Sequence, residues 1–171
     1  MRHTTALFTL ALLAPLAMTA TPAAAQGPAA MTMVEKLYQP GAEIDALIAK
    51  AKANQKSPNV NSVIPIITMK PYRVLLEYRT GLTPPTNHHA QAELVHVVKG
   101  AANLATGGHL TGIQPPRPGN STDVGTGIEG ATKRHIVAGD YVMVPPETAH
   151  QFQDVEGEFV IISVHLLMPE K

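Results

Sequence analysis

The sequence predicts an all-β protein, built as an antiparallel sandwich or barrel, with one helix near its N-terminus. From Val60 onward, roughly eight short segments contain alternating β-branched, aliphatic and aromatic residues, which is typical of strands. Glycine and proline separate these segments, as they do at the turns of antiparallel sheets. One segment upstream of Val60 has the apolar spacing of an amphipathic helix.

The N-terminal residues have the features of a secretory signal peptide, expected at residues 1–25. Arg2 precedes an apolar run at 6–18, and three alanines precede Gln26. The apolar run is short for a hydrocarbon layer of about 30 Å, which favours a cleaved leader over a membrane anchor. We expect cleavage after Ala25 and a periplasmic or secreted protein with no membrane contact once the leader is removed.

The composition limits the classes of function. The 171 residues include no cysteine, which excludes disulfides, thiolate metal sites and cysteine nucleophiles. Thirteen basic residues balance thirteen acidic ones, so no broad positive field favours nucleic acid or anionic lipid. We therefore expect a small-molecule ligand or substrate and no nucleic-acid partner.

An N-terminal segment at 26–59 is predicted to contain the helix. Within residues 41–53, four apolar residues fall on one stripe: Ile44, Leu47, Ile48 and Ala51. Acidic residues come early in this segment and lysines come late, which matches the helix dipole. The stripe is expected to pack on the barrel or on a second subunit.

The barrel is expected to occupy residues 60–171 as one domain. The alternating segments predict strands at 63–68, 72–79, 93–99, 101–106, 133–137, 141–144, 150–154 and 158–167. Residues 107–130 contain many glycines and prolines without sustained periodicity, and they are predicted to form a long loop. The loop could cover the mouth of the barrel, although an exposed insertion is the ordinary interpretation.

Potential metal ligands are concentrated in two segments, 81–100 and 139–154. These segments contain His88, His89, Glu93, His96 and His150. Because one histidine comes much later than the other residues, the fold must bring the two segments together. Imidazole and carboxylate groups are common ligands of divalent transition metals.

Strand alternation points to one ligand set. In an uninterrupted strand, Asn87, His89 and Glu93 point to one face and His88 points to the opposite face. The imidazoles of His89 and His150, with the carboxylate of Glu93, would leave positions on an ion open for water or substrate. Such a set is typical of non-haem Fe(II) and is also suited to Mn, Zn, Ni or Co.

Other residues bear on the expected pocket. Phe152 shares the face of His150 and would give the site an apolar wall. His165 could reach the pocket from the last strand, but a surface position at the end of the barrel is favoured. Arg73 and Arg79 share one face of their strand, and an inward arginine would favour a carboxylate substrate.

The two segments resemble the two motifs of the cupin superfamily. The first motif, G-x5-H-x-H-x3/4-E-x6-G, is matched at Gly81, His89, Glu93 and Gly100. The second motif, G-x5-P-x-G-x2-H-x3-N, is matched at Gly139, Pro145 and His150. The resemblance extends over about residues 72–167, with the predicted loop as an insertion.

The resemblance implies a double-stranded β-barrel, or jelly roll, with a divalent metal in its mouth. The implied ligands are His89, Glu93 and His150. Cupins include dioxygenases, isomerases, decarboxylases and lyases, so the resemblance names no single reaction. We expect a metal-dependent enzyme that acts on a small organic molecule, and, since such barrels commonly pair, a homodimer.

Three residues depart from the cupin motifs. Asn87 occupies the position of the usual first histidine, and Glu147 and Asp154 replace a glycine and an asparagine. Asn87 is therefore a candidate fourth ligand, as is the adjacent His88 if the strand is bulged. Asn87 could instead hydrogen-bond a water on the metal. A weakened ligand set favours the alternative function, a non-catalytic periplasmic module that binds a small ligand or a metal.

Overall fold

A computed structural model of the protein describes residues 36–114 and 121–168. Its elements are η1 (Gly41–Glu43), α1 (Ile44–Asn54), β1 (Ser62–Met69), β2 (Tyr72–Arg79), β3 (Thr86–His88), β4 (Gln91–Thr106), β5 (His109–Thr111), β6 (Thr122–Val124), β7 (Gly127–Glu129), β8 (Thr132–Val137), β9 (Tyr141–Val144) and β10 (His150–Leu167). The predicted signal peptide lies outside the described residues. Within these residues, no helix has the length and apolar character needed to cross a membrane.

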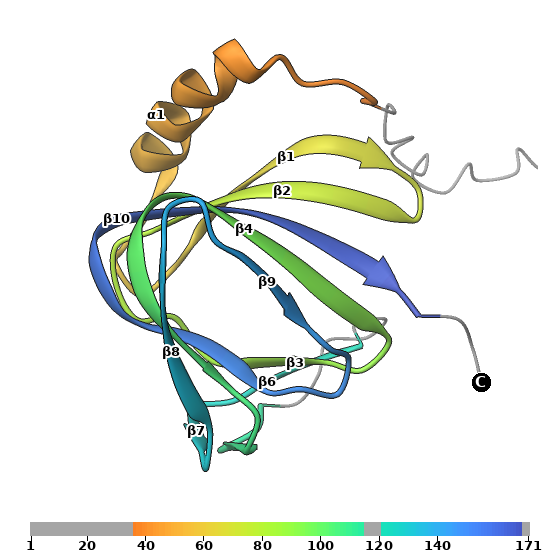
Figure 1. Ribbon diagram of the computed structural model, residues 1–171, viewed down its shortest axis with the longest axis vertical. Coiled ribbons are helices and arrows are strands. Elements are labelled where there is room, and N and C mark those ends of the chain that lie inside the picture. The colour runs from red at the N-terminus through yellow and green to blue at the C-terminus, as the bar shows by residue number, and fades with distance from the viewer. Residues whose placement is uncertain (1–35, 115–120, 169–171) are drawn as a thin grey trace, which may run out of the picture. The chain divides into compact units, whose positions relative to one another are not determined.

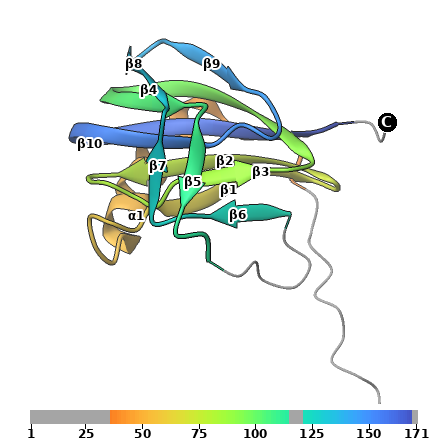
Figure 2. The same ribbon diagram turned by 90° about the horizontal axis from the view of Figure 1, so that it is seen from below.

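Eight of the strands form one antiparallel sheet that curves around a common interior (Figure 1). The path β1-β2-β10-β3-β6 is joined by β4, which pairs with β10, β8 and β9. β5 and β7 form a separate two-stranded sheet. Figure 2 shows β8 and β9 on one side of this barrel and β1 on the opposite side. The predicted all-β fold with one N-terminal α-helix is confirmed.

Two long strands, β4 and β10, pair along most of their lengths. The alternation pattern predicts each of them as two strands, interrupted at Gly100 in β4 and after Asp154 in β10. The structure keeps both strands continuous and bends them, with register shifts between Gln153 and Ile161. Bulges of this kind take up extra residues while pairing continues on both sides.

The bend of β4 requires glycine at position 100. Gly100 has a φ of +79°, a conformation that side-chain-bearing residues rarely adopt. A Cβ at this position would lie 2.1 Å from the carbonyl oxygen of Glu158. The backbones of β4 and β10 can therefore approach each other here only because there is no side chain.

Helix α1 packs its apolar stripe against the outside of the barrel. Ile48 and Ala51 are buried in a cluster with apolar residues of β1, β2 and β10. The Lys52 ammonium also lies 2.5 Å from the Glu158 carboxylate of β10. Both contacts hold the helix on the barrel. Of the two surfaces that the sequence left open for the helix, the barrel and a second subunit, the structure shows the barrel.

The predicted loop at 107–130 contains three short strands in its described part. β5 pairs with β7, and β6 pairs with β3. Each strand has three residues, which is too short to show the alternation by which a strand is recognised in sequence. Through β6, this segment places Thr122 and Val124 beside β3.

The two faces of β2 have different surroundings. Leu76 and Tyr78 pack in the outer cluster with α1. Alternation turns Glu77 and Arg79 toward the barrel interior, where both are buried. The sequence left open which face of this strand points inward, and the structure shows that it is the face of Arg79. Arg73, near the start of the same strand, is exposed.

Candidate metal centre

Four side chains meet inside the barrel: His88 of β3, Glu93 of β4, and His150 and His165 of β10. Glu93 Oε2 lies 3.0 Å from His150 Nε2 and 3.6 Å from His88 Nε2. Glu93 Oε1 lies 3.8 Å from His165 Nε2. Single ligand atoms of His88, Glu93 and His165 lie within 4.8 Å of one another. We call these four residues the His3Glu cluster.

Strand pairing explains how these residues come together. His165 is the register partner of Glu93 in the β4–β10 ladder, so their side chains leave the sheet on the same face. His150 lies at the other end of β10, opposite Thr86 of β3. The same short strand β3 carries His88 two residues later, on the same face as Thr86.

Each imidazole of the His3Glu cluster is held at Nδ1 and presents Nε2 to the carboxylate. His88 Nδ1 lies 2.8 Å from the Thr122 hydroxyl. The Nδ1–H of His150 donates to the Thr148 carbonyl at 3.1 Å, and that of His165 donates to Gln91 Oε1 at 3.0 Å. Such contacts orient metal-binding histidines and select the tautomer with a free lone pair on Nε2.

The contacts of His150 place its Nε2 against the Glu93 carboxylate. Its Nδ1 donates to a carbonyl, and its Nε2 lies 3.0 Å from a Glu93 carboxylate oxygen and 3.2 Å from the Thr86 hydroxyl. Two acceptors at this distance repel unless a proton or a metal ion lies between them. One proton can serve one imidazole, whereas one metal ion can bind His88, Glu93 and His165 together, because their ligand atoms lie within 4.8 Å of one another. The donor set therefore fits a divalent metal ion.

Burial makes the charge of the cluster sensitive to its partners. Glu93 and His150 are 4% and 3% exposed. Burial alone would raise the pKa of Glu93, but the neighbouring imidazoles of His150 and His88 outweigh it and bring the pKa below its usual range. Burial lowers the pKa of His165, although the Glu93 carboxylate opposes this shift. Both shifts favour the forms that bind metal, an ionised Glu93 and a neutral His165.

The structure places His89, a sequence-predicted ligand, outside the cluster. His89 lies in the bend between β3 and β4, and its side chain is 40% exposed. Its Nδ1 lies 2.7 Å from Glu147 and its Nε2 lies 2.9 Å from Asp123. β3 ends at His88 and β4 begins at Gln91, so residues 89–90 do not belong to a strand. The alternation of side-chain directions that holds within β4 therefore cannot be extended from Glu93 back to His89. His88, and not the predicted His89, is therefore the histidine that faces Glu93.

Asn87 and His165 also differ from the sequence expectation. By alternation, Asn87 points away from the face that carries Thr86 and His88, and its buried Oδ1 has no hydrogen-bond partner among the described residues. His165, for which a surface position was favoured, is instead a member of the cluster. Only the register between β4 and β10 reveals it, because nothing close to His165 in sequence marks it as a ligand.

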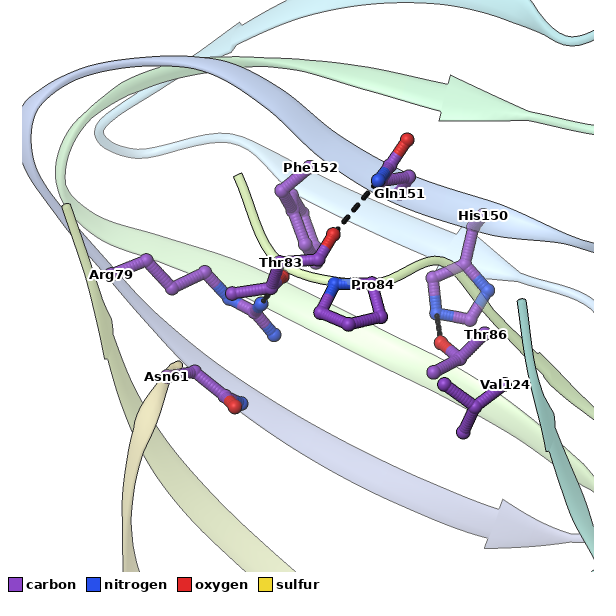
Figure 3. Close-up of a pocket in the computed structure, with 9 residues that line it drawn as sticks. All are labelled: Asn61, Arg79, Thr83, Pro84, Thr86, Val124, His150, Gln151 and Phe152. Atoms are coloured by element: carbon purple, nitrogen blue, oxygen red, sulfur yellow. Dashed lines mark hydrogen bonds between the residues drawn. The ribbon is translucent and has the colours of Figure 1, made fainter. Parts of the chain in front are cut away.

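A cavity of about 220 Å³ adjoins the His3Glu cluster. Figure 3 shows its lining, with Thr86 and His150 on one side, Asn61 and Arg79 on the other, and Phe152 on the side of Arg79. Phe152 is buried and packs against Phe159 with ring centroids 5.5 Å apart. His150 thus lies on both the cluster and the cavity, and it connects them.

Comparison with solved structures identifies the fold. The hydroquinone 1,2-dioxygenase PnpCD, in complex with Cd²⁺ and 4-hydroxybenzonitrile, matches with a TM-score of 0.52, 19% sequence identity, and coverage of 71% of this chain and 72% of that one. A cupin superfamily protein from Desulfitobacterium hafniense DCB-2 matches with a TM-score of 0.46, 13% identity, and coverage of 69% and 87%. The described chain has the cupin fold.

Other cupin-fold structures are similar at the same level. KdgF from Halomonas sp. matches with a TM-score of 0.47, 15% identity, and coverage of 68% of this chain and 87% of that one. At such identities the similarity concerns the fold alone. The sequence matches no protein-family model, and a search of curated proteins found no significant match.

Proposed function

We propose that the His3Glu cluster binds one divalent metal ion, and that this cupin is a metal-dependent enzyme acting on a small organic molecule. The observation that carries the proposal is the convergence of ligand atoms of His88, Glu93 and His165 within 4.8 Å of one another, with His150 Nε2 3.0 Å from the buried Glu93 carboxylate. His88 and His165 turn the same nitrogen toward the same carboxylate. Fe, Mn, Zn or Ni suits a set of three imidazoles and one carboxylate.

A bound ion would supply Lewis-acid polarisation of a substrate carbonyl or, with redox-active iron or manganese, oxidation chemistry of the dioxygenase type. The residues of the chain have separate parts in this arrangement. Thr122, Thr148 and Gln91 hold the three imidazole rings in place. Glu93 serves as a ligand and not as a free base. Phe152 excludes water from one wall of the cavity.

A non-catalytic module that binds a metal or a small ligand is the second candidate function. The described lining of the cavity supports it, because it contains no carboxylate, lysine or tyrosine, and its one histidine belongs to the His3Glu cluster. A ligand to the metal is unavailable as a general acid or base. The reaction type, whether dioxygenase, isomerase or lyase, therefore depends on the metal and the substrate.

Adjacent histidines allow a matched test of the metal site. We expect protein purified without added chelator to carry about one divalent ion per chain, measured by elemental analysis. His88→Gln should lose this ion, whereas His89→Gln should keep it, because only His88 faces Glu93. Equal metal contents in the two variants, or a folded wild-type protein that takes up no added Fe, Mn, Zn or Ni, would refute the proposal.

If metal is present, the two candidate functions can be separated with substrates. Oxygen consumption across a panel of diketones and aromatic acids tests the oxidative version, and loss of the activity in His88→Gln but not in His89→Gln assigns it to the cluster. Metal binding without turnover of any compound, with oxygen present or absent, favours the non-catalytic module.

We also propose that the protein is exported, with its leader cleaved after Ala25, and that it is a homodimer. The basic residue, apolar run and alanines at the N-terminus support export. Exposed apolar side chains on β9, such as Tyr141 at 69% and Met143 at 49%, support association. We expect the mass of the mature protein to correspond to a chain that begins at Gln26, and an intact N-terminus would contradict export with cleavage. We expect a dimer in analytical ultracentrifugation, and a monomer would contradict the homodimer.

A further inference from the structure

The cavity beside the His3Glu cluster has a second charged end. Figure 3 shows Arg79 and His150 on opposite sides of the lining, with Thr83 and Pro84 between them. Arg79 comes from β2 and is only 8% exposed. Its guanidinium carbon lies 4.8 Å from the centroid of the Phe152 ring, which holds the group against the cavity wall.

The hydrogen bonds of Arg79 leave much of its donor capacity unused. Nη2 donates to Glu77 at 2.6 Å and Nη1 donates to Thr83 Oγ1 at 2.5 Å. A guanidinium has five N–H donors, and the buried Nε of Arg79 has no partner among the described residues. Nη1 and Nη2 each keep one further N–H, and as parts of a residue that lines the cavity they can donate to an acceptor on a ligand.

Glu77 is not the acceptor for these further N–H groups. Its carboxylate accepts hydrogen bonds from three groups: Arg79 Nη2 at 2.6 Å, Asn61 Nδ2 at 2.8 Å and Ser163 Oγ at 2.7 Å. It is thus held behind the guanidinium by its own donors, and it does not line the cavity. The remaining N–H groups of Arg79 stay available for a second acceptor.

We propose that this cavity binds a small organic acid whose carboxylate lies on the Arg79 guanidinium and whose remaining part extends toward His150. The proposal rests on the proposed function for the end at the His3Glu cluster, and it adds the class of substrate. Planar carboxylates match the fork of an arginine, and such pairs are the stronger hydrogen bonds in proteins.

Charge favours an anion over a neutral ligand. Glu77 compensates the charge of Arg79, and Glu93 compensates half the charge of a divalent ion in the cluster. The formal charge inside the metal-loaded barrel is therefore positive, and one carboxylate would neutralise it. In a buried site of low polarity, such compensation counts for more than it would in water.

The dimensions of the cavity limit the size of the acid. Its volume of about 220 Å³ lies below the roughly 300–1,000 Å³ of sites for drug-sized ligands. An adjoining depression of about 400 Å³ shares part of its lining, including Pro84 and Val124, and adds the apolar Leu82. A short acid with a small apolar body fits this arrangement.

Titration with acids and their neutral amides tests the proposal. The probes are pyruvate against pyruvamide and benzoate against benzamide, added to the metal-free and the Zn²⁺-loaded protein. The readouts are calorimetric affinity and the Nε–H resonance of Arg79, which is assigned by its loss in Arg79→Lys. We expect at least one acid to shift this resonance and to bind about tenfold or more tightly than its amide.

Two arginine variants provide a matched comparison. Arg79→Lys keeps the charge but loses the planar fork, and it should weaken acid binding by about tenfold. Arg134→Lys changes an exposed arginine of β8 outside the cavity and should leave the affinity unchanged. If Arg79→Lys does not fold, Val124→Phe tests whether the acid binds in this cavity. The larger side chain narrows the cavity and leaves the Glu77–Arg79 pair unchanged. The same tenfold loss is then expected.

The outcomes separate this proposal from the proposed function. Equal affinities for acid and amide, or an acid affinity that Arg79→Lys or Val124→Phe leaves unchanged, would overturn the organic-acid proposal even in a protein that binds metal. Acid binding through Arg79 in a protein that takes up no metal would instead uphold it and reject the metal-dependent function.

Discussion

At the scale of single residues, the Nδ1 contacts decide what the imidazoles of the His3Glu cluster can do. His88 and His89 are neighbours in sequence, but only His88 has one nitrogen held by a hydroxyl and the other turned toward Glu93. His89 has a carboxylate at both nitrogens, and its hydrogen bonds to Glu147 and then to Asp123 raise its pKa. A protonated ring has no lone pair for a metal, so His89 is suited to an ion-pair contact at the rim.

Thr122→Val should weaken metal binding without removing a ligand. The substitution deletes the hydroxyl that lies 2.8 Å from His88 Nδ1 and nearly preserves the side-chain shape. Loss of such an orienting contact typically lowers metal affinity by about tenfold to a hundredfold. Competition for Zn²⁺ against a chelating dye measures the change. Thr132→Val, at an exposed threonine of β8, is the control, and equal affinities in the two variants would mean that Thr122 does not orient His88.

At the scale of elements, two bent strands position the site. β4 supplies Glu93, and β10 supplies His150 and His165 from its two ends. The bends allow these long strands to pair with several neighbours and so to close the barrel. The bend of β4 includes Gly100, where the backbones of β4 and β10 approach each other closely.

Gly100→Ala and Gly139→Ala should differ in stability for a reason that is specific to this bend. Both glycines have positive φ, +79° and +97°, so each substitution costs roughly 1–2 kcal/mol for the backbone conformation. Only Gly100 also meets the Glu158 carbonyl, whereas a Cβ at Gly139 meets nothing within 4 Å. Urea unfolding should therefore show a clearly larger loss for Gly100→Ala. Similar losses would argue against a tight crossing.

At the scale of the whole described unit, one acidic side chain joins α1 to the barrel. The Glu158 carboxylate lies 2.5 Å from Lys52 Nζ, 2.7 Å from Lys99 Nζ and 2.9 Å from the Tyr78 hydroxyl. Hydrogen bonds from Lys52, Lys99 and Tyr78, in that order, lower the pKa of Glu158 to about 2. Helix, β2, β4 and β10 thus share one ionised group.

Glu158→Gln should change how stability depends on pH. The folded pKa of about 2 lies below the ordinary value of 4.5, so the contribution of Glu158 is complete above about pH 4.5 and is lost as the pH falls toward 2. The variant should be less stable than the wild type at pH 7, and the difference should shrink below pH 4.5. Urea unfolding at pH 7, 4.5 and 3 measures this. Glu156→Gln, at an exposed acid, should show no such trend, and a pH-independent difference for Glu158→Gln would contradict the assignment.

The sequence could predict the fold class because alternation, turns and the single amphipathic helix are local patterns. Motif spacing also selected Glu93 and His150, which the structure brings together. The other two members of the cluster depend on non-local facts. His88 replaces His89 because the strand stops at the bend, and His165 enters through its register with β4. Neither the end of a strand nor the register of a ladder can be read from neighbouring residues.

β10 carries two of the three imidazoles of the cluster, His150 and His165, and also Phe152 of the cavity wall. During translation, His150 and His165 are therefore the last residues of the cluster to be synthesised. An ion could be captured only after this strand has been made and inserted between β2 and β4. Loading would then report on completion of the barrel, and a chain stalled before β10 would remain without its ion.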